Sequence, residues 1–448
     1  MSDPAGISGC ILWLKAGTGI FKDAGTTPAA DGDGVAQWND ASGNGKNFTQ
    51  TTSDKRPKWN TTDQLVEGVY FSVTQFLSHA TFSYNWQAGS FFAIGRQSTL
   101  RDSGGNTPSS SQSFHNIVSN QVPTVLFGYA GTTADGETSG QLRKAMLVDG
   151  AFKVGSVFLP TNLSLYGFAG GAGSFTLITN ETSDSVAASS VSTTTGLNII
   201  SSLNNVFSMW GGISEVVAYD HQLNGTEIAL MQTYAQSVGV VFNPLNIISF
   251  DGDSITAGLD SPLNRGWVRQ LSLPGKTSYQ FSMGRASVTL ATLLSERPTF
   301  IDPFIIGGKR NVLVIFAGTN DITSGSTAAA TYANLVSYCQ GARSAGWNKI
   351  CVVTMLPRTD LAVPASRTTY NTLIRNNALT DWDALGDWGG NATMGQDGDD
   401  TNPTYYSDGI HPTTVGHGIG AGIISTALLT LLQSPSGSNH FLTLLGVG

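Results

Sequence analysis

A serine, an aspartate and a histidine stand at two distant points of the chain, in a pattern that suits nucleophilic hydrolysis. Ser254 lies in the sequence Gly-Asp-Ser-Ile directly after a largely apolar run, and Asp408 and His411 stand three residues apart near the C-terminus. A serine hydroxyl attacks efficiently only when a base takes its proton, and an imidazole is such a base. A carboxylate fixes the tautomer of that imidazole and stabilises its protonated form. We therefore predict that Ser254, Asp408 and His411 are the catalytic residues of an esterase.

Two segments between these ends carry further polar groups. Gly284 lies in the sequence Ser-Met-Gly-Arg, and Asn320 lies in Gly-Thr-Asn-Asp directly after the apolar run 312–316. We expect both segments at the carboxyl ends of parallel strands, where open α/β sheets bind their ligands. The oxyanion of a tetrahedral intermediate needs fixed donors, each worth about 3 kcal/mol. We predict an oxyanion hole made of the backbone N–H groups of Ser254 and Gly284 and the side-chain amide of Asn320. Glycine at 284 is expected to let the backbone approach the substrate closely.

These ordered segments resemble the SGNH (GDSL-type) hydrolase superfamily over roughly residues 244–434. The four signature residues of that family match Ser254, Gly284, Asn320 and His411, and its usual triad acid matches Asp408. Two positions depart from the family pattern, because isoleucine replaces leucine after the serine, and the glycine segment reads Ser-Met-Gly-Arg-Ala-Ser instead of Asn-x-Gly-x-x-Gly. The resemblance implies a flavodoxin-like α/β/α domain with a parallel sheet, and an acyl-enzyme reaction that uses no metal or cofactor.

Two competing motifs fail on inspection. The nucleophile elbow Gly-x-Ser-x-Gly requires glycine two residues after the serine, where Thr256 stands. Residues 43–47 contain Gly-Asn-Gly-Lys-Asn, but a phosphate loop requires an earlier glycine where Asp40 stands, and Ser or Thr where Asn47 stands. The chain therefore contains neither motif.

Composition limits the classes of partner. Only 12% of the 448 residues are charged, about half of the usual share of roughly 25%. A net charge of −8 without a basic cluster argues against nucleic acid, since phosphate binding requires many Lys and Arg residues. The surface must instead be rich in Gly, Ser, Thr and Asn, which is typical of secreted or virion proteins and of carbohydrate contacts. The three cysteines, Cys10, Cys339 and Cys351, are predicted to be small core residues.

The first half of the chain has the rhythm of an antiparallel β domain, with short apolar or alternating runs separated by turn residues. The expected strands cover residues 11–15, 68–71, 90–94, 125–129, 145–148, 164–168, 197–200 and 212–218, and a helix is expected after 224–227. The sequences at 12–16, 38–43, 56–57 and 212–220 resemble those of a concanavalin-A-like (laminin-G-like) jelly-roll domain. This resemblance implies a β-sandwich that binds glycans or serves in assembly.

The second half alternates buried strands with helices. Strands are expected at 247–250, 312–316 and 350–355, a helix at 328–345, and a final helix at 418–432. We divide the chain into a β domain at 1–241, a hydrolase domain at 242–436 and a tail at 437–448. The junction has no flexible Gly/Ser linker, so we expect the two domains to be docked.

Several further residues near the expected site have weaker signals. Arg265, Trp267 and Arg285 are candidate substrate contacts. Asp253 and Asp321 are interpreted as structural, and His417 as a packing residue of the final helix.

Acidic residues elsewhere leave one alternative open. Asp31, Asp33 and Asp40, or the loop 397–400, have the composition of a calcium site, but acidic residues of this kind usually form turns. We therefore predict no metal and no cofactor.

The resulting hypothesis is a serine esterase that removes O-acetyl groups from a polysaccharide or surface glycan. The start of the chain lacks signal-peptide features, which fits a virion-attached phage enzyme in contact with other virion proteins, or a cytoplasmic enzyme. Residues 418–432 are shorter than the roughly 20 residues of a membrane span. A homo-oligomer is compatible with the sequence. Two alternatives stay open: a lipase or acyl esterase of small or lipid esters, and a catalytically silent adhesin or virion decoration protein.

Overall fold

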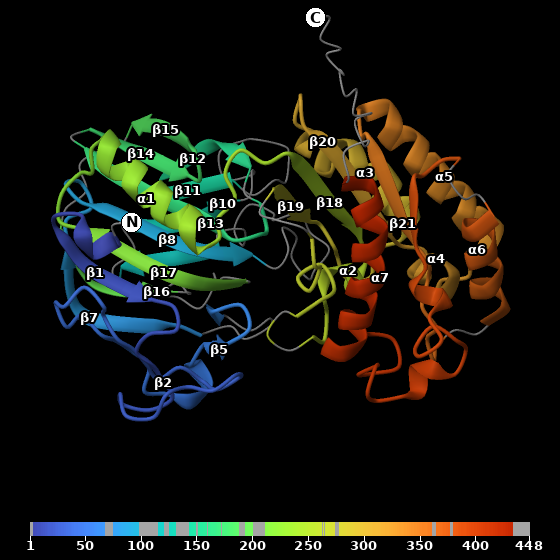
Figure 1. Cartoon of the computed structure of the whole chain (residues 1–448), viewed down its shortest axis with the longest axis horizontal. Coiled ribbons are helices and arrows are strands. Elements are labelled where there is room, and N and C mark those ends of the chain that lie inside the picture. The colour runs from blue at the N-terminus through green and yellow to red at the C-terminus, as the bar shows by residue number, and fades with distance from the viewer. Residues whose placement is uncertain are drawn as a thin grey trace, which may run out of the picture.

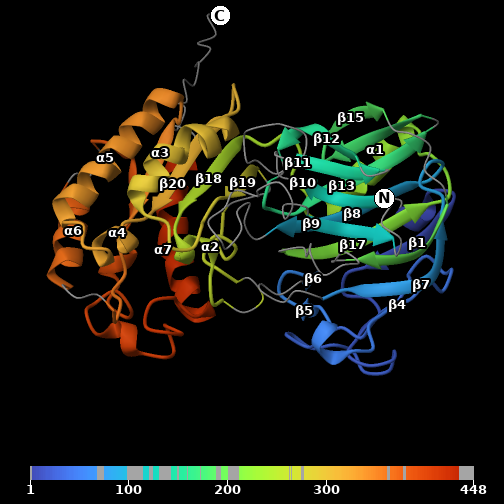
Figure 2. The ribbon, with the colours of Figure 1, turned by 180° about the vertical axis from the view of Figure 1, so that it is seen from behind.

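The chain forms two domains that lie side by side, one built mainly of strands and one built of strands and helices (Figure 1). The view from behind shows the same arrangement (Figure 2). The structure is a computed structural model that describes residues 3–67, 75–97, 115–120, 125–130, 143–148, 151–158, 160–171, 173–187, 193–199, 211–261, 263, 265–273, 277–360, 364–376 and 380–432. The expected strand at 68–71 and the expected tail at 437–448 lie outside these ranges.

The N-terminal domain contains two antiparallel sheets. The first has the order Thr182–Ala187 (β15), Ser174–Thr179 (β14), Ser164–Gly171 (β13), Ser90–Gln97 (β8), Gly211–Tyr219 (β17), Leu65–Glu67 (β6) and Lys58–Asn60 (β5), with Cys10–Lys15 (β1) also paired to β17. The second has the order Ala151–Phe158 (β12), Arg143–Val148 (β11), Val125–Ala130 (β10), His115–Asn120 (β9), Thr194–Ile199 (β16), Leu77–Tyr84 (β7), Phe48–Thr49 (β4), Gln37–Trp38 (β3) and Ile20–Phe21 (β2).

Alternation of side chains explains how the first sheet is covered on both faces. In β8, Phe91 and Ala93 belong to the core shared with the second sheet, whereas Phe92 and Ile94 face the core beneath the helix Gly225–Val238 (α1). Successive side chains of a strand point to opposite faces, so both faces of this strand are buried. The predicted helix start is confirmed, because Asn224 and Glu227 form a capping box there.

The C-terminal domain is built around a parallel sheet with the order Ser278–Ser282 (β19), Asn246–Gly252 (β18), Arg310–Phe316 (β20), Lys349–Val353 (β21) and Ala384–Gly386 (β22). Numbered along the chain, this order is 2-1-3-4-5, the flavodoxin-like order. Such sheets bind their ligands at the carboxyl ends of the strands, at the point where the strand order reverses. Here that point lies between β18 and β20.

Helices cover both faces of this sheet. They are Ser254–Ala257 (α2), Leu290–Phe300 (α3), Thr319–Thr323 (α4), Ala328–Ala345 (α5), Pro364–Asn376 (α6) and Thr414–Leu432 (α7). In β20, Leu313 and Ile315 belong to the core that includes residues of α3, α5 and α6, whereas Val314 and Phe316 belong to the core that includes residues of α7. The expected α/β domain with a parallel sheet is therefore confirmed.

The strands and helices expected in this domain are present, although the sequence analysis gave no range for six elements. These elements are short or contain interrupting polar residues, so their apolar pattern is weak: α2, β19, α3, α4, α6 and β22. Among the described residues α7 alone is long and apolar enough to cross a membrane. It packs against β21 and β22 as the final helix of this domain, with Ala421, Ile424 and Leu428 buried.

The two domains are joined by hydrogen bonds as well as by chain continuity. The backbone N–H of Thr161 donates to the carbonyl of Gln280 at 2.6 Å. The hydroxyl of Tyr279 donates to Glu181 at 2.7 Å and accepts from the side-chain amide of Asn180 at 3.2 Å. The two domains are therefore in direct contact, which agrees with the docked arrangement expected from the lack of a flexible linker.

Candidate active site

Ser254 is the first residue of α2 and follows a sharp turn at the end of β18. Gly252 makes this turn possible, because a Cβ atom there would lie 2.3 Å from the carbonyl oxygen of Phe316 and 2.4 Å from the hydroxyl of Thr256. Asp253 caps the helix, since its carboxylate accepts the backbone N–H of Ile255 at 2.9 Å. The turn places Ser254 at the carboxyl edge of the sheet, between β18 and β20.

The structure brings Ser254, His411 and Asp408 together. Nε2 of His411 lies 2.9 Å from the hydroxyl oxygen of Ser254, and Nδ1 lies 2.7 Å from a carboxylate oxygen of Asp408. A carboxylate only accepts hydrogen bonds, so Nδ1 carries the proton and Nε2 is the acceptor for the serine. This is the arrangement in which a histidine can deprotonate a serine.

The loop before α7 fixes the position of the histidine. Asp408 accepts the backbone N–H groups of Ile410 and His411 at 2.9 and 2.7 Å. Burial alone raises the pKa of Asp408, but the hydrogen bonds from the backbone and imidazole of His411 outweigh it and hold that pKa below its ordinary value. A backbone hydrogen bond of 3.0 Å from Thr359 to Gly409 ties this loop to the segment after β21. Asp408 is therefore ionised at neutral pH.

Asn320 lies in α4, at the carboxyl end of β20. Its side-chain amide donates one N–H to the carbonyl oxygen of Val288 at 2.8 Å. An amide nitrogen carries two hydrogens, and the bond to Val288 fixes the group so that nitrogen, not oxygen, occupies this side. Within the described residues this leaves the second N–H for an oxyanion.

Gly284 follows β19 and packs against the backbone of α2. A Cβ atom at this position would lie 2.2 Å from the backbone nitrogen of Ala257 and 2.5 Å from the carbonyl carbon of Thr256. Glycine is therefore required here by close packing against α2. The expectation that glycine lets the backbone approach the substrate stays a prediction beside this packing requirement.

Asp253 and Asp321 are structural, in agreement with the sequence interpretation. Asp321 accepts the backbone N–H groups of Leu290 and Ala291 at 2.7 and 3.4 Å, which ties α4 to the start of α3. Asp253 is fully buried, and burial raises its pKa to about 6. Both side chains therefore hold segments of the site in place.

The three candidate substrate contacts have other partners. Trp267 is fully buried and packs edge-on against Phe250 with ring centroids 5.5 Å apart, so the structure contradicts a role in substrate contact. Arg285 is 6% exposed and its guanidinium pairs with Glu296. Both side chains are therefore engaged in contacts within the C-terminal domain.

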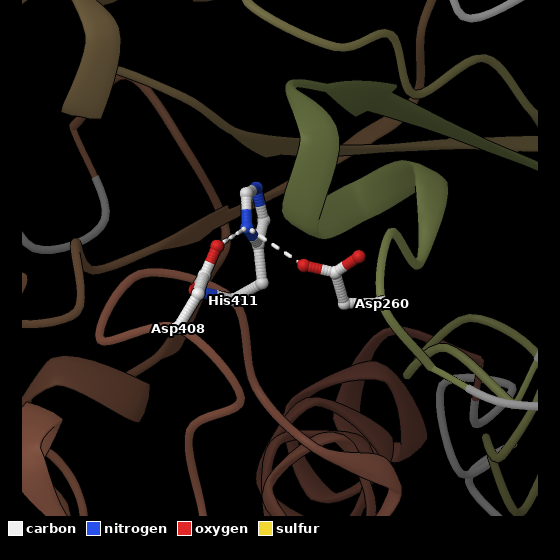
Figure 3. Close-up of side chains that lie close together, drawn as sticks. All are labelled: Asp260, Asp408 and His411. Carbon is white, nitrogen blue, oxygen red and sulfur yellow. Dashed lines mark hydrogen bonds and ion pairs between the residues drawn. The ribbon is translucent and has the colours of Figure 1, made fainter.

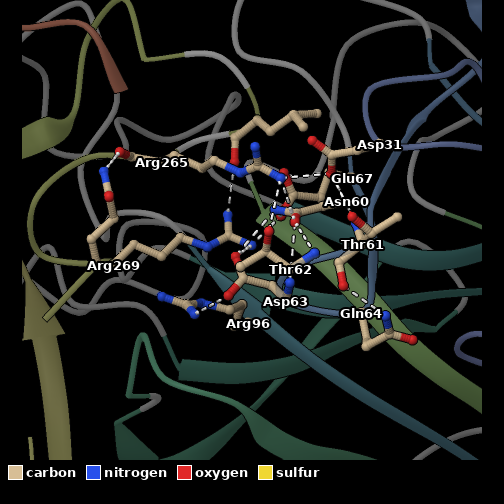
Figure 4. A network of polar contacts seen from close by, with 12 residues as sticks. Asp31, Asn60, Thr61, Thr62, Asp63, Gln64, Glu67, Arg96, Arg265 and Arg269 are labelled. Carbon is tan, nitrogen blue, oxygen red and sulfur yellow. Dashed lines mark hydrogen bonds and ion pairs between the residues drawn. The ribbon is translucent and has the colours of Figure 1, made fainter. Parts of the chain in front are cut away.

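Arg265 points across the domain boundary into a polar network (Figure 4). Its guanidinium donates to Asp31 at 2.6 Å and to Asn60 at 3.0 Å. In the same network Arg269 pairs with the fully buried Glu67 and lies 2.9 Å from Asp63. Arg265 thus contacts the N-terminal domain instead of a substrate, and the segment after the nucleophile helix is held by that domain.

His417 is a packing residue, as expected, but it also holds the same segment. It is fully buried on α7, and its Nδ1 accepts the backbone N–H of Trp267 at 3.2 Å. Burial lowers the pKa of His417 to about 3, so the ring is neutral at neutral pH.

Sequence reasoning missed one carboxylate of the site. Asp260 lies beside His411 with a carboxylate oxygen 3.4 Å from Nδ1, as Figure 3 shows. Nothing in the local sequence of residues 258–262 distinguishes this aspartate from an ordinary turn residue.

The candidate calcium ligands are engaged elsewhere. Asp31 pairs with Arg265, Asp33 pairs with Lys22, and Asp40 accepts the backbone N–H groups of three residues. In the loop 397–400 each aspartate pairs with an arginine or caps the backbone. Among the described residues the one group with metal-ligand geometry is Asp260, Asp408 and His411.

Comparison with known proteins places the site in a family. Residues 250–419 match the GDSL-like Lipase/Acylhydrolase family. A member of the lipolytic G-D-S-L family from Veillonella parvula is similar at 19% identity over 40% of this chain and 95% of its own, with a TM-score of 0.35. A catalytic mutant of an acetylxylan esterase from Geobacillus stearothermophilus is similar at 15% identity over 42% of this chain and 95% of its own, with a TM-score of 0.34. A search of curated proteins found no match.

The family match begins in β18 and ends in α7, so it includes the segments that carry Ser254, Gly284, Asn320, Asp408 and His411. It does not extend into the N-terminal domain. The C-terminal half of this chain therefore carries an esterase domain of the GDSL-like lipase/acylhydrolase family.

Proposed function

We propose that this protein is a serine esterase that removes O-acetyl groups from a polysaccharide through an acyl-enzyme on Ser254. The observation that carries the proposal is the hydrogen-bonded chain from Ser254 through His411 to Asp408, with distances of 2.9 and 2.7 Å.

Acylation begins when the hydroxyl oxygen of Ser254 attacks the ester carbonyl carbon. Nε2 of His411 takes the hydroxyl proton, and the negative carboxylate of Asp408 stabilises the imidazolium that forms. The carbonyl oxygen becomes an oxyanion, which accepts hydrogen bonds from the side chain of Asn320 and from the backbone N–H groups of Ser254 and Gly284. The bond between the acyl carbon and the sugar oxygen then breaks, and His411 gives its proton to this departing oxygen, which leaves as a sugar hydroxyl.

Deacylation repeats these steps with water. His411 takes a proton from a water molecule, whose oxygen attacks the acyl carbon bound to Ser254. The second tetrahedral intermediate uses the same oxyanion donors. When it collapses, the bond to the serine oxygen breaks, His411 gives the proton back to Ser254, and acetate leaves.

Two observations support a short acyl group on a polar substrate. A long acyl chain requires a contiguous apolar surface near the site. Among the described residues the exposed large apolar side chains are few, and they are spread over several elements: Leu230, Val238, Leu245, Ile306 and Val415. The docked β domain, which resembles concanavalin-A-like jelly rolls, supports a carbohydrate substrate.

Tryptophan does not supply a sugar-stacking surface in the described part of the chain. Eight of the nine tryptophans are described, and each is at most 4% exposed. Trp210 lies outside the described residues.

The proposal is tested by acetate release from acetylated polysaccharides, together with hydrolysis of p-nitrophenyl esters of increasing acyl length. We expect Ser254→Ala to lower kcat by about 10³-fold or more while the thermal midpoint stays unchanged. Ser295→Ala is the matched control, because Ser295 is exposed on α3 and the substitution is the same. Full activity of the Ser254→Ala variant would refute the mechanism.

The substrate panel separates the alternatives. Release of acetate with activity that falls as the acyl chain lengthens supports the deacetylase. Faster hydrolysis of long chains would instead show a lipase. No hydrolysis of any ester, combined with binding of the intact chain to a glycan, would show a binding protein with a silent site.

We further propose that the enzyme acts as part of a phage virion. The low share of charged residues and the surface rich in Gly, Ser, Thr and Asn support this placement. Mass spectrometry of purified particles tests it, and absence of the protein from the particles would refute it.

A further inference from the structure

Two carboxylates approach the same nitrogen of His411. Asp408 lies 2.7 Å from Nδ1 and Asp260 lies 3.4 Å from it. Figure 3 shows the two carboxylates on either side of this nitrogen, Asp408 from the loop before α7 and Asp260 from the segment after α2. Only the contact with Asp408 has hydrogen-bond geometry, so Asp260 interacts with the imidazole through its charge.

The backbone of Asp260 adopts a conformation that few residues other than glycine tolerate. Its φ angle is 61°, in the left-handed region. This conformation costs an ordinary residue about 1 kcal/mol or more, and it persists only where the surrounding structure enforces it. Aspartate and asparagine adopt it more readily than most side chains. An exchange of Asp260 for asparagine therefore keeps the backbone conformation of this position.

The segment that carries Asp260 is held at several points. Gly258 and Gly266 approach so closely that a Cβ atom on Gly258 would lie 2.9 Å from the Cα atom of Gly266. The hydroxyl of Ser261 lies 3.3 Å from that of Thr414, the first residue of α7. With the contacts of His417 and the N-terminal domain described above, these bonds fix the segment on both sides of Asp260.

Other ionisable groups near His411 are Asp253 at the start of α2 and His417 on α7. In the segment after β21, Arg358 interacts electrostatically with Asp253, and Asp360 interacts with Asp408. His417 is neutral at neutral pH, so it contributes no charge there. Asp253 is fully buried, and its pKa of about 6 means that it titrates near the pH range in which a histidine titrates. An experiment on Asp260 must therefore separate its effect from that of Asp253.

We propose that Asp260 is a second carboxylate of the catalytic histidine, a positioning residue that stabilises the imidazolium of His411 alongside Asp408. This inference rests on the proposed esterase reaction. Asp408 fixes the tautomer, and Asp260 adds negative charge at the moment when His411 holds the proton. Within the part of the chain that the structure describes, Asp260 is the carboxylate that remains within 4.0 Å of Nδ1 when Asp408 is removed.

Asp260→Asn is the sharpest test, because asparagine has the same shape and tolerates the same backbone conformation. Loss of the negative charge lowers the pKa of His411. The histidine must be neutral to act as a base, so the acidic limb of kcat/KM against pH moves to lower pH. We expect a shift of about 0.5 to 1 pH unit, reduced in about 1 M NaCl since the carboxylate is 44% exposed. A decrease in kcat of about 3- to 10-fold should accompany it.

A double-mutant cycle adds a second readout. If both carboxylates serve His411, the combined Asp408→Asn and Asp260→Asn variant should lose more activity than the product of the two single losses. Asp54→Asn is the matched control, because it removes the same charge from an exposed position of the N-terminal domain. All assays contain EDTA, since Asp260, Asp408 and His411 lie close enough to chelate a cation.

The outcome is independent of whether any ester is hydrolysed. The protein has six histidines, so the His411 resonance can be assigned by comparison with His411→Gln and titrated by NMR. A lower pKa of His411 in Asp260→Asn, with the Asp54→Asn value equal to that of the native protein, supports the inference. An unchanged pKa of His411 overturns it, even if the rate has fallen. Failure of the esterase assay alone would refute the proposed reaction and leave this titration to decide the role of Asp260.

Discussion

The two domains contribute to the site in different ways. The C-terminal domain holds Ser254, His411 and Asp408, which lie within the range of its family match and at the carboxyl edge of its parallel sheet. The described part of the N-terminal domain holds no comparable cluster of reactive side chains, and its core is formed by two sheets and one helix. It instead binds Arg265 and Arg269, which follow Asp260 in the same segment. The comparison teaches that one segment, residues 258–269, connects the chemistry of one domain with the packing of the other.

Among the variants that test this comparison, the largest effect should be a loss of activity from a change within the C-terminal domain. Asn320→Ala removes the side-chain donor for the oxyanion, so we expect kcat to fall by about 10²- to 10³-fold with little change in KM. Thr323→Ala is the control, because it alters an exposed residue of the same short helix. Steady-state kinetics measures both variants, and an Asn320→Ala enzyme with native kcat would show that the amide does not act in the transition state.

Changes to the arginines at the domain boundary should have a smaller effect, and this effect should appear in the free energy of unfolding. Arg269→Ala removes the cation that is hydrogen-bonded to the fully buried Glu67 and leaves only the longer-range interaction of Glu67 with Arg96. Breaking such a buried pair costs about 3 kcal/mol or more. Arg265→Ala should cost at most about 1 kcal/mol, because its partner Asp31 is 41% exposed. Urea unfolding compares the two variants. Equal losses of stability in the two variants would mean that burial of the partner carboxylate does not decide how much each ion pair contributes.

Adding Glu67→Gln to Arg269→Ala should restore part of the lost stability, because the unpaired buried charge is then absent. If the double variant is no more stable than Arg269→Ala, the stability is lost through packing and not through the unpaired charge of Glu67.

The smallest effect is a change in how stability depends on pH. It comes from His417 on α7, which holds the segment after α2 through the backbone of Trp267. The pKa of His417 falls from an ordinary value near 6.5 to about 3 in the folded protein, chiefly through burial. The unfolded chain therefore binds a proton that the folded protein does not, and the contribution of His417 to stability is complete above pH 6.5 and lost as the pH falls toward 3. Between pH 6.5 and 5 the native protein should lose about 2 kcal/mol more than His417→Gln.

Asp253 acts in the opposite direction. Its folded pKa of about 6 lies above the ordinary value of 3.8, so acidification through pH 6 stabilises the folded state. This contribution is present in both proteins and cancels in their difference. Urea unfolding at the two pH values checks the prediction, and parallel pH dependences of the two proteins would contradict it.

Much of the fold was predictable from residue patterns. The strands at the centre of the parallel sheet are continuous apolar runs, and the capping box at Asn224 marks the start of α1. Elements with weak patterns were missed. The substrate contacts proposed for Trp267 and Arg265 were not found, because the first side chain is in the core and the second is bound across the domain boundary.

The sequence by itself determined which groups are available for the proposed chemistry, because Ser254, His411, Asp408 and Asn320 have the side-chain types and the order expected of a serine esterase. Only the tertiary structure decided the rest. It showed that Gly284 is required by contact with the backbone of α2, and that Asp260 lies beside His411. Such contacts join residues far apart in the chain and depend on loop paths and backbone angles, which no local pattern of residue types specifies.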